Sequence, residues 1–265
     1  MLSGSTAPAV AVNDLTFTYP GARTPVFQGI SLALLPGARC LLLGANGTGK
    51  STLLRLIAGR HMIAHQVIRV LGRPAFHDTT LAGEVAFLGG PFPFEADISV
   101  RDILAARPVT DPARRARVLE ILEVDPRWRM HRVSDGQRRR VQLSLDLERP
   151  LKVILLDEVT AELDVLSRAD LLRFLRAESE QHGVTIIYAS HVLEGLSAWG
   201  THLAFLSPGR LRQFAPLAAV DELRPDGRAA RAAAVPGAPS ALHQLCEWWM
   251  QEDRQALRAA AASSG

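Results

Sequence analysis

The chain has 265 residues, of which 48% are hydrophobic and 22% charged, and this composition excludes disorder over most of its length. It is long enough for one large domain or two small ones with a proper core. Its 30 basic and 27 acidic residues leave a net charge of +3, which is too small to indicate nucleic acid as a partner.

The first third of the chain reads as short strands around one helix. Alternating or continuous apolar residues predict strands over Ala9–Tyr19, Ile30–Leu35, Arg39–Leu43, Gln66–Leu71 and Val85–Leu88. A glycine-rich loop follows the third of these strands. After it, Thr52–Ala58 carries apolar residues at helical spacing and ends at Gly59, which predicts a helix.

From Ser99 to Leu147 the pattern becomes helical. Three helix starts are predicted there: at Ser99 with Asp102 at capping-box spacing, at Asp111-Pro112, and at Ser134 or Asp135. Further on, the pattern predicts strands at Val153–Leu156, Val184–Ala189 and His202–Leu206. It predicts one long helix at Leu166–Gln181. Strands that alternate with helices after a strand-rich start indicate an α/β domain with a helical insertion.

The C-terminal part differs in composition. Residues 216–239 are rich in Ala, Pro and Gly and read as a linker, and Ser240–Ala260 is predicted as a last helix. This helix carries Trp248 and Trp249. We favour their docking on the chain's own domain over their insertion into a partner's groove.

The loop Gly44–Thr52 (GANGTGKST) fits the pattern GxxxxGK[ST], and it lies between a predicted strand and a predicted helix. Glycines allow consecutive backbone N–H groups to point into one concavity, to which the helix N-terminus adds its positive end. Lys50 can then bridge the β- and γ-phosphates of a nucleotide, and the Ser51 hydroxyl can ligate Mg²⁺. The alternative is a glycine-rich turn without a ligand.

Acidic residues end another apolar strand. Val153–Leu156 runs directly into Asp157 and Glu158, which is the Walker B arrangement. Asp157 would hold Mg²⁺, and Glu158 would be the base that orients the attacking water. An ordinary acidic loop is the alternative, and the phosphate loop elsewhere in the chain makes it the weaker one.

Two further groups suit a nucleotide site. Ser134–Gln137 opens a predicted helix, so its hydroxyl and backbone amides can form an anion site. His191 follows the strand at Val184–Ala189, where a switch residue could sense the γ-phosphate. A structural histidine is the alternative for His191.

With these motifs in this order, the chain resembles the ATP-binding-cassette (ABC) ATPases over about residues 9–212. GANGTGKST resembles their Walker A motif, VSDGQ their signature, VILLDE their Walker B motif, LD at Asp164 their D-loop, and His191 their H-switch. Tyr19 resembles the aromatic A-loop residue that stacks on adenine, for which a core aromatic is the alternative.

The resemblance implies an α/β fold, a P-loop NTPase ABC cassette with a RecA-like core, an antiparallel β-subdomain and a helical signature subdomain. We expect the cassette at residues 9–215 with its helical subdomain at about 95–150, then a linker at 216–239 and a C-terminal helical tail at 240–265. It also implies that two copies pair head to tail in an ATP-dependent homodimer, each binding ATP with Mg²⁺. Ser134 and Gly136 of one copy would complete the site on Lys50 of the other.

The residues implied for each role are the following. Catalytic residues are Lys50, Glu158 and His191; ATP-binding residues are Tyr19, Gly44, Ala45, Asn46, Gly47, Thr48, Gly49, Lys50, Ser51 and Thr52; signature residues acting in trans are Ser134, Asp135, Gly136 and Gln137; the D-loop residue is Asp164; metal-binding residues are Ser51 and Asp157.

The sequence departs from transporter cassettes at two places. Where those carry a Gln after the strand that follows the β-rich part, this chain has Gly89-Gly90, and the signature has Asp135 where Gly is typical. WRMH before SDGQ and the missing Gln resemble one group, the soluble ABC ATPases described with the fungal CCR–NOT complex and the plant stand-alone subfamily I proteins. That resemblance implies an ATPase without membrane domains. Because the Gln is missing, we expect slow hydrolysis, and we expect a regulatory or switch module with a regulatory protein complex as partner.

The cysteines and the N-terminus bear on location. Cys40 and Cys246 have no disulfide or zinc spacing, which favours a reducing compartment. We expect no signal peptide or membrane segment, since no apolar run approaches the ~20 residues of a membrane helix. A cytoplasmic protein is expected, or a nuclear one in a eukaryote. The alternative function is the ATP-binding subunit of a transporter whose membrane domains are encoded separately.

Arginines surround the signature. Arg138–Arg140 follow it, and Arg127, Arg129 and Arg132 precede it. They could bind an anionic partner such as RNA. Because the charge of the domain is nearly balanced, we favour a solvated helix face, and nucleic acid is not indicated.

Overall fold

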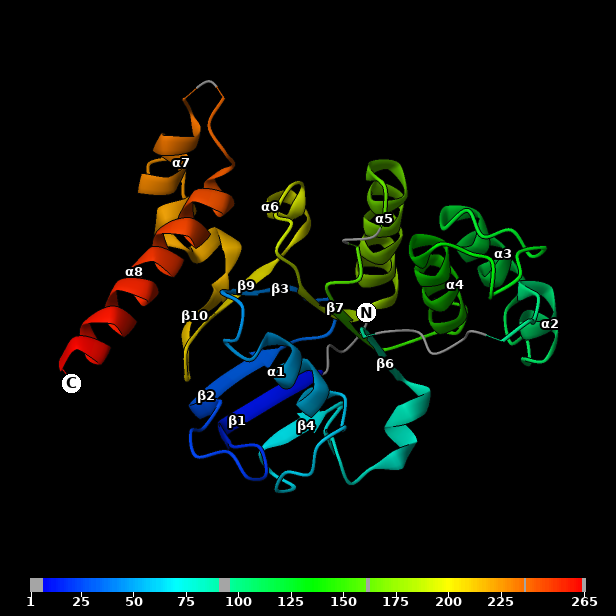
Figure 1. Ribbon diagram of the computed structural model, residues 1–265, viewed down its shortest axis with the longest axis horizontal. Coiled ribbons are helices and arrows are strands. Elements are labelled where there is room, and N and C mark those ends of the chain that lie inside the picture. The colour runs from blue at the N-terminus through cyan, green and yellow to red at the C-terminus, as the bar shows by residue number, and fades with distance from the viewer. Residues whose placement is uncertain (1–6, 91–95, 161–162, 236, 264–265) are drawn as a thin grey trace.

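The computed structural model describes residues 7–90, 96–160, 163–235 and 237–263. Two β-sheets with helices around them build the fold (Figure 1). The first sheet is antiparallel, with strand order β2-β1-β4-β5. Its strands are β1 (Val10–Phe17), β2 (Phe27–Leu34), β4 (Ile68–Val70) and β5 (Arg73–Pro74).

The second sheet has six strands in the order β10-β9-β3-β8-β7-β6. All of its neighbouring strands pair in parallel except the edge pair β10 and β9, which is antiparallel. The strands are β3 (Arg39–Gly44), β6 (Val85–Leu88), β7 (Val153–Asp157), β8 (Thr185–Ala189), β9 (His202–Ser207) and β10 (Arg210–Pro216). The α/β fold with an antiparallel β-subdomain is therefore confirmed.

Helix α1 (Lys50–Ile57) lies between the two sheets. Leu53 and Leu54 are fully buried in a core that joins the antiparallel sheet to one face of the six-stranded sheet. A second core covers the opposite face, and residues from α2 to α5 and from the C-terminal helix contribute to it. Because β3 and β8 are buried along their whole length, they are continuous apolar runs, as is usual for parallel strands covered on both faces.

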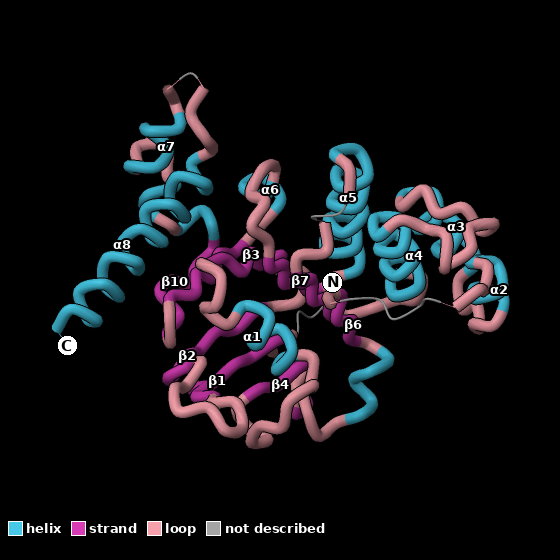
Figure 2. Tube along the Cα trace, viewed as in Figure 1, coloured by secondary structure: helices cyan, strands magenta, loops and turns pink. Residues whose placement is uncertain are grey.

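Helices α2 (Val100–Ala105), α3 (Pro112–Ile121) and α4 (Asp135–Leu147) gather at one side of the molecule, with α4 next to β6 (Figure 2). Their N-caps are Ser99, Asp111 and Ser134, the three starts that the sequence predicts. Helix α5 (Val165–His182) ends at Gly183 in the left-handed conformation. Two further short helices are η1 (Thr79–Gly83) and α6 (Leu196–Trp199).

The segment 216–239 differs from the expected loose linker. It contains η2 (Leu217–Ala219), η3 (Asp221–Leu223) and α7 (Arg228–Ala233), which precede α8 (Ala241–Ser263). Val220 and Ala229 are buried in the core, and alanine is the best helix former, so this alanine-rich stretch packs as short helices. The boundaries of the domains themselves stay a prediction.

Both tryptophans of α8 contact the chain itself. The ring of Trp249 lies 4.9 Å from that of Phe205 on β9, and the guanidinium of Arg228 lies 3.7 Å from the centre of the Trp248 ring. Docking on the chain's own cassette is thus confirmed for Trp249, whereas Trp248 contacts α7. Figure 1 shows α8 beside β10, on the opposite side of the fold from α2 and α3. No helix in the described ranges is both long and apolar enough to cross a membrane.

Candidate active site

Three neighbouring strands bring the predicted site residues together. Strand β8 lies between β3 and β7, and its Ala189 is level with Leu42 on one side and Asp157 on the other. The loops that follow these strands therefore meet at one edge of the sheet, where α/β proteins bind their ligands. They carry the phosphate loop, Glu158 and His191.

The phosphate loop needs its last glycine. Gly49 has a φ of 99°, in the left-handed region, and it is the N-cap of α1. A Cβ added there would lie 2.7 Å from a ring carbon of Phe27. Glycine thus permits both the turn and the close approach to β2, and it leaves the N-terminus of α1 open toward a phosphate.

Lys50 is folded back onto this loop. Its ammonium donates to the carbonyl oxygens of Gly44 at 2.8 Å and Ala45 at 3.1 Å. Burial lowers the pKa of Lys50, while Glu158 and Asp157 favour its charged form. The ammonium is therefore held by two neutral acceptors, from which it can move to a negatively charged phosphate.

Ser51 and Asp157 form the predicted metal pair. The Ser51 hydroxyl donates to a carboxylate oxygen of Asp157 at 3.0 Å. Burial raises the pKa of Asp157, and the bond from Ser51 opposes that shift. A hydroxyl beside a half-buried carboxylate is an oxygen donor set that fits Mg²⁺.

Glu158 and His191 face each other across the β7 and β8 ends. Nδ1 of His191 lies 3.6 Å from a carboxylate oxygen of Glu158, and both side chains are partly exposed. Glu158 has a φ of 55°, which is uncommon for a residue with a side chain. Its N–H donates to Ala189 at 2.9 Å, so the loop is held in this strained shape, and such strain clusters at functional sites.

Tyr19 lies beside the first turn of α1. Its hydroxyl is 3.0 Å from the Thr52 hydroxyl, and its ring meets Phe17 and His61 edge to face at 5.1 Å and 5.5 Å. The residue is partly exposed, as a side chain that stacks on a base must be. This geometry is compatible with the predicted adenine contact.

Gly89 is a site residue whose contact the sequence does not predict. A Cβ at Gly89 would lie 2.6 Å from the Cβ of Asp157, so no side chain fits there unless Asp157 moves. The chain therefore gives Asp157 room at the place where transporter cassettes carry their Gln. The glycine pair at the end of β6 is the only signal for it in the sequence.

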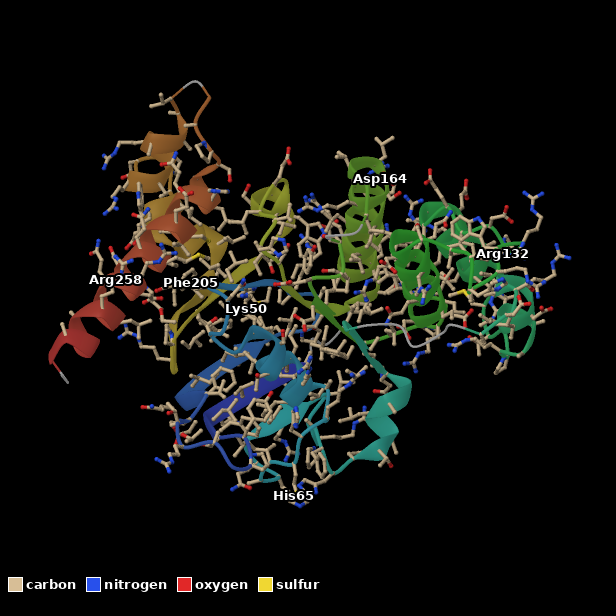
Figure 3. The ribbon with its side chains drawn as sticks, in the orientation of Figure 1. Lys50, His65, Arg132, Asp164, Phe205 and Arg258 are labelled. Carbon is tan, nitrogen blue, oxygen red and sulfur yellow. The ribbon has the colours of Figure 1, made fainter. Side chains whose placement is uncertain are left out.

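The signature residues are not brought to this edge. Ser134 and Gln137 form a capping box at the start of α4, with bonds of 3.2 Å and 3.0 Å between side chains and backbone. Ser134 and Asp135 are exposed. Figure 3 shows Arg132, two residues before Ser134, well apart from Lys50.

Arginines of α4 connect the signature helix to the rest of the site. Arg140 forms ion pairs with Glu123 and with Asp164. Asp164 is the N-cap of α5, and hydrogen bonds from Ser167 lower its pKa. Arg139 donates to the carbonyl oxygen of Gly90 at 2.9 Å, so it links α4 to the residue after Gly89. The contacts of Arg139 and Arg140 favour a structural role over a free basic face.

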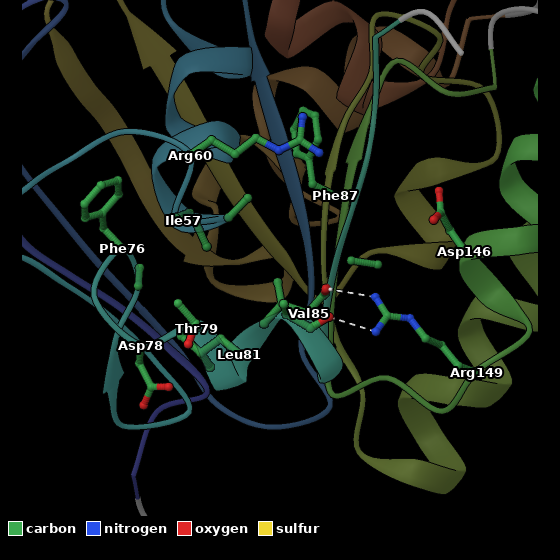
Figure 4. A pocket seen from close by; sticks show the side chains of 15 residues that line it. Ile57, Arg60, Phe76, Asp78, Thr79, Leu81, Val85, Phe87, Asp146 and Arg149 are labelled. Carbon is green, nitrogen blue, oxygen red and sulfur yellow. Dashed lines mark hydrogen bonds between the residues drawn. The ribbon is translucent and has the colours of Figure 1, made fainter. Parts of the chain in front are cut away.

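Two cavities lie near these elements. A cavity of about 730 Å³ has the phosphate loop and His191 on one wall and α8 on another. A cavity of about 360 Å³ lies near the end of α1, between β6 and α4, and contains none of the predicted site residues (Figure 4). In it Arg60 lies over the Phe87 ring and Arg149 donates to Ala82 and Val85.

A phosphate loop between a parallel strand and a helix, with an acidic strand end beside it, defines a P-loop nucleotide-binding protein. The chain belongs to the ABC transporter family: the family description "ABC transporter" matches residues 27–161. It is an ATP-binding cassette with the ATPase motifs of that family.

Similar proteins and a solved structure also belong to this family. The chain is 44% identical to "ABC transporter I family member 20" of Arabidopsis thaliana over 80% of this chain and 71% of that protein. It is 36% identical to "CCR4-associated factor 16" of Saccharomyces cerevisiae over 77% of each. The fold matches the ATP-binding cassette MJ0796, solved as a dimer in a post-hydrolysis state with ADP and Pi, with a TM-score of 0.65 at 19% identity over 78% of this chain and 98% of that one.

Proposed function

We propose that this chain binds and slowly hydrolyses ATP, and that two copies pair head to tail around two ATP molecules. Each copy supplies Lys50 and the loop Gly44–Thr52 to one site and its signature to the other. The observation that carries the proposal is the separation of two groups. Lys50, Ser51, Asp157, Glu158 and His191 gather at one edge of the sheet, whereas the exposed signature lies apart from them.

In this mechanism the loop amides and the N-terminus of α1 bind the phosphates. Lys50 leaves the carbonyls of Gly44 and Ala45 for the β- and γ-phosphate oxygens. Glu158 orients a water and accepts its proton, and His191, 3.6 Å from Glu158, contacts the γ-phosphate.

Ser51 and Asp157 would hold Mg²⁺, whose chemistry is to neutralise developing charge on the phosphates. The two side chains already lie 3.0 Å apart, and Gly89 leaves Asp157 its room. Directly after β6, where transporter cassettes carry a Gln, Gly89 has no side chain that could touch a metal. This supports slow turnover.

We further propose a role as a stand-alone regulatory or switch module with a protein complex as partner, in the cytoplasm or the nucleus. Support comes from two relatives, "ABC transporter I family member 20" and "CCR4-associated factor 16". Tyr19 would stack on the adenine of ATP. Asp164, the D-loop residue, would lie at the contact between the two copies.

The test is the variant Glu158→Gln, with Glu120→Gln on the exposed face of α3 as the matched control. Loss of the base is expected to slow turnover roughly 100-fold or more while ATP binding persists. ATP should then hold a lasting dimer, measured by light scattering on a sizing column with and without ATP. The control should behave as wild type. A Glu158→Gln protein that stays monomeric in excess ATP contradicts the head-to-tail proposal.

The alternative, an ATP-binding subunit of a transporter, is supported by the family match and by relatives such as the "Nickel import ATP-binding protein NikO" of Rhodobacter capsulatus, which is 34% identical over 80% of this chain and 91% of that protein. Gly89-Gly90 in place of a Gln speaks against it. Purification of the tagged chain decides between them, because a membrane protein present in equal amount would favour the transporter subunit.

A further inference from the structure

The cavity of about 730 Å³ joins two parts of the chain that are far apart in sequence. The phosphate loop and His191 line one wall, and residues of α8 from His243 to Leu257 line another. Its apolar lining comes from both sides: Leu43, Leu193, Pro208, Cys246, Met250 and Leu257. Leu257 is 56% exposed, so the cavity is an open apolar socket beside the phosphate loop.

Two of the most exposed large apolar side chains in the described residues lie next to each other at the start of α5. Val165 is 83% exposed and Leu166 75% exposed. Single exposed apolar residues are common, but an adjacent pair at a helix start presents a knob that water solvates poorly.

The knob and the socket lie close to the same segment of the chain. The segment after β8 separates them: His191 and Leu193 line the socket, while Val192 and Glu194 line a pocket shared with Val165. A knob and a socket side by side are self-complementary under a two-fold axis, because each copy can place its knob in the other's socket.

Charge favours the same arrangement. On α8, His243 pairs with Glu247, and Asp253 accepts from Ser207 and faces Arg212. Arg254 at the socket and Glu194 beside the knob have no ion-pair partner in the parts of the chain that the structure describes. Opposite charges on the two rims suit contact between copies.

We propose that the knob of Val165 and Leu166 in one copy occupies the socket between α8 and the phosphate loop of a second copy, with Arg254 facing Glu194. The proposal rests on the two-copy function above and adds α8 to it. The C-terminal helix would then be part of the contact between copies, and it would press the partner's α5 against the phosphate loop.

The first test introduces Leu166→Asp into the Glu158→Gln protein. An acid in the first turn of α5 suits the helix N-terminus, so folding is preserved. The dissociation constant of the ATP-bound dimer is expected to rise about tenfold or more, since the change places a charge in both sockets. The matched control is Val109→Asp, an exposed apolar residue between α2 and α3 that should leave the dimer unchanged.

The second test mixes Leu166→Cys and Leu257→Cys proteins, both with Glu158→Gln, under a mild oxidant. An ATP-dependent disulfide between the two proteins is expected, and Leu166→Cys with Val109→Cys should give none. Cys40 and Cys246 will not compete, because burial raises the pKa of each thiol to about 12.

The outcomes separate the two proposals. If the Glu158→Gln dimer forms but Leu166→Asp does not weaken it and no mixed disulfide appears, the docking proposal is overturned and the proposed function stands. If the Glu158→Gln protein never dimerises with ATP, both are overturned.

Discussion

The two halves of the candidate site are held in different ways. The phosphate-loop half is tied together within the chain: Lys50 is bonded to Gly44, Ser51 to Asp157, and Tyr19 to Thr52. In the signature half, the side chains of Ser134 and Gln137 are bonded within their own helix start, and Ser134 is exposed. If the proposed function holds, nucleotide binding is a property of one chain, whereas completion of the site needs the signature of a second copy.

The largest expected effect is on the first half. Lys50→Ala removes the charge aimed at two phosphates, and hydrogen bonds to charged groups contribute about 1.5–3 kcal/mol each. ATP affinity should fall roughly 100-fold or more, measured by titration calorimetry. Lys152, the other lysine of the chain, is exposed and supplies the control Lys152→Ala. Retained tight binding by Lys50→Ala would refute this assignment.

A change in the signature half should lower turnover but leave ATP binding by one chain almost unchanged. Gly136→Asp places a further acid at the start of α4, where the helix tolerates it, but where it would repel the phosphates of a partner's ATP. We expect a loss of about 100-fold in turnover with ATP binding by the monomer almost unchanged. Gly83→Asp, at a site with open space, is the control. Equal losses of binding and turnover would mean that the two halves are not separate.

The sequence predicts the first half well because its patterns are local. The segment Gly44–Thr52 connects the end of β3 to the first turn of α1, as expected from the strand and helix on either side of it, and Ser134 caps α4 as expected. The roles of these residues stay predictions. Neither the contact of Gly89 with Asp157 nor the position of α8 beside the phosphate loop could be read from the sequence, because each depends on how distant elements pack.

The same reason explains the segment 216–239. Its composition resembles a linker, but Val220 and Ala229 find buried positions against elements that periodicity does not reveal. Composition reports the average tendency of a stretch, whereas tertiary contacts decide whether it packs.

A smaller effect is expected at the boundary between the halves. Gly89→Ala would push Asp157 aside, since the added Cβ lies 2.6 Å from the Cβ of Asp157. The Mg²⁺ concentration needed for half-maximal turnover should rise about tenfold, as is typical when a neighbour of a metal ligand is disturbed. Gly83→Ala is the control with open space. An unchanged Mg²⁺ dependence would mean that Asp157 does not hold the metal.

The smallest effects concern the contact between Tyr19 and the adenine of ATP. Base–aromatic stacking contributes about 1–3 kcal/mol, so Tyr19→Ala should weaken ATP binding roughly tenfold. Tyr19→Phe keeps the ring and loses only the 3.0 Å contact with Thr52, so it should cost about twofold. Binding of inorganic triphosphate, which has no base, should be equal in all three proteins. These affinities separate the roles of Tyr19: a Tyr19→Ala protein that binds ATP as wild type does makes Tyr19 a core aromatic, and equal losses in both variants would place the effect in the hydroxyl that orients α1.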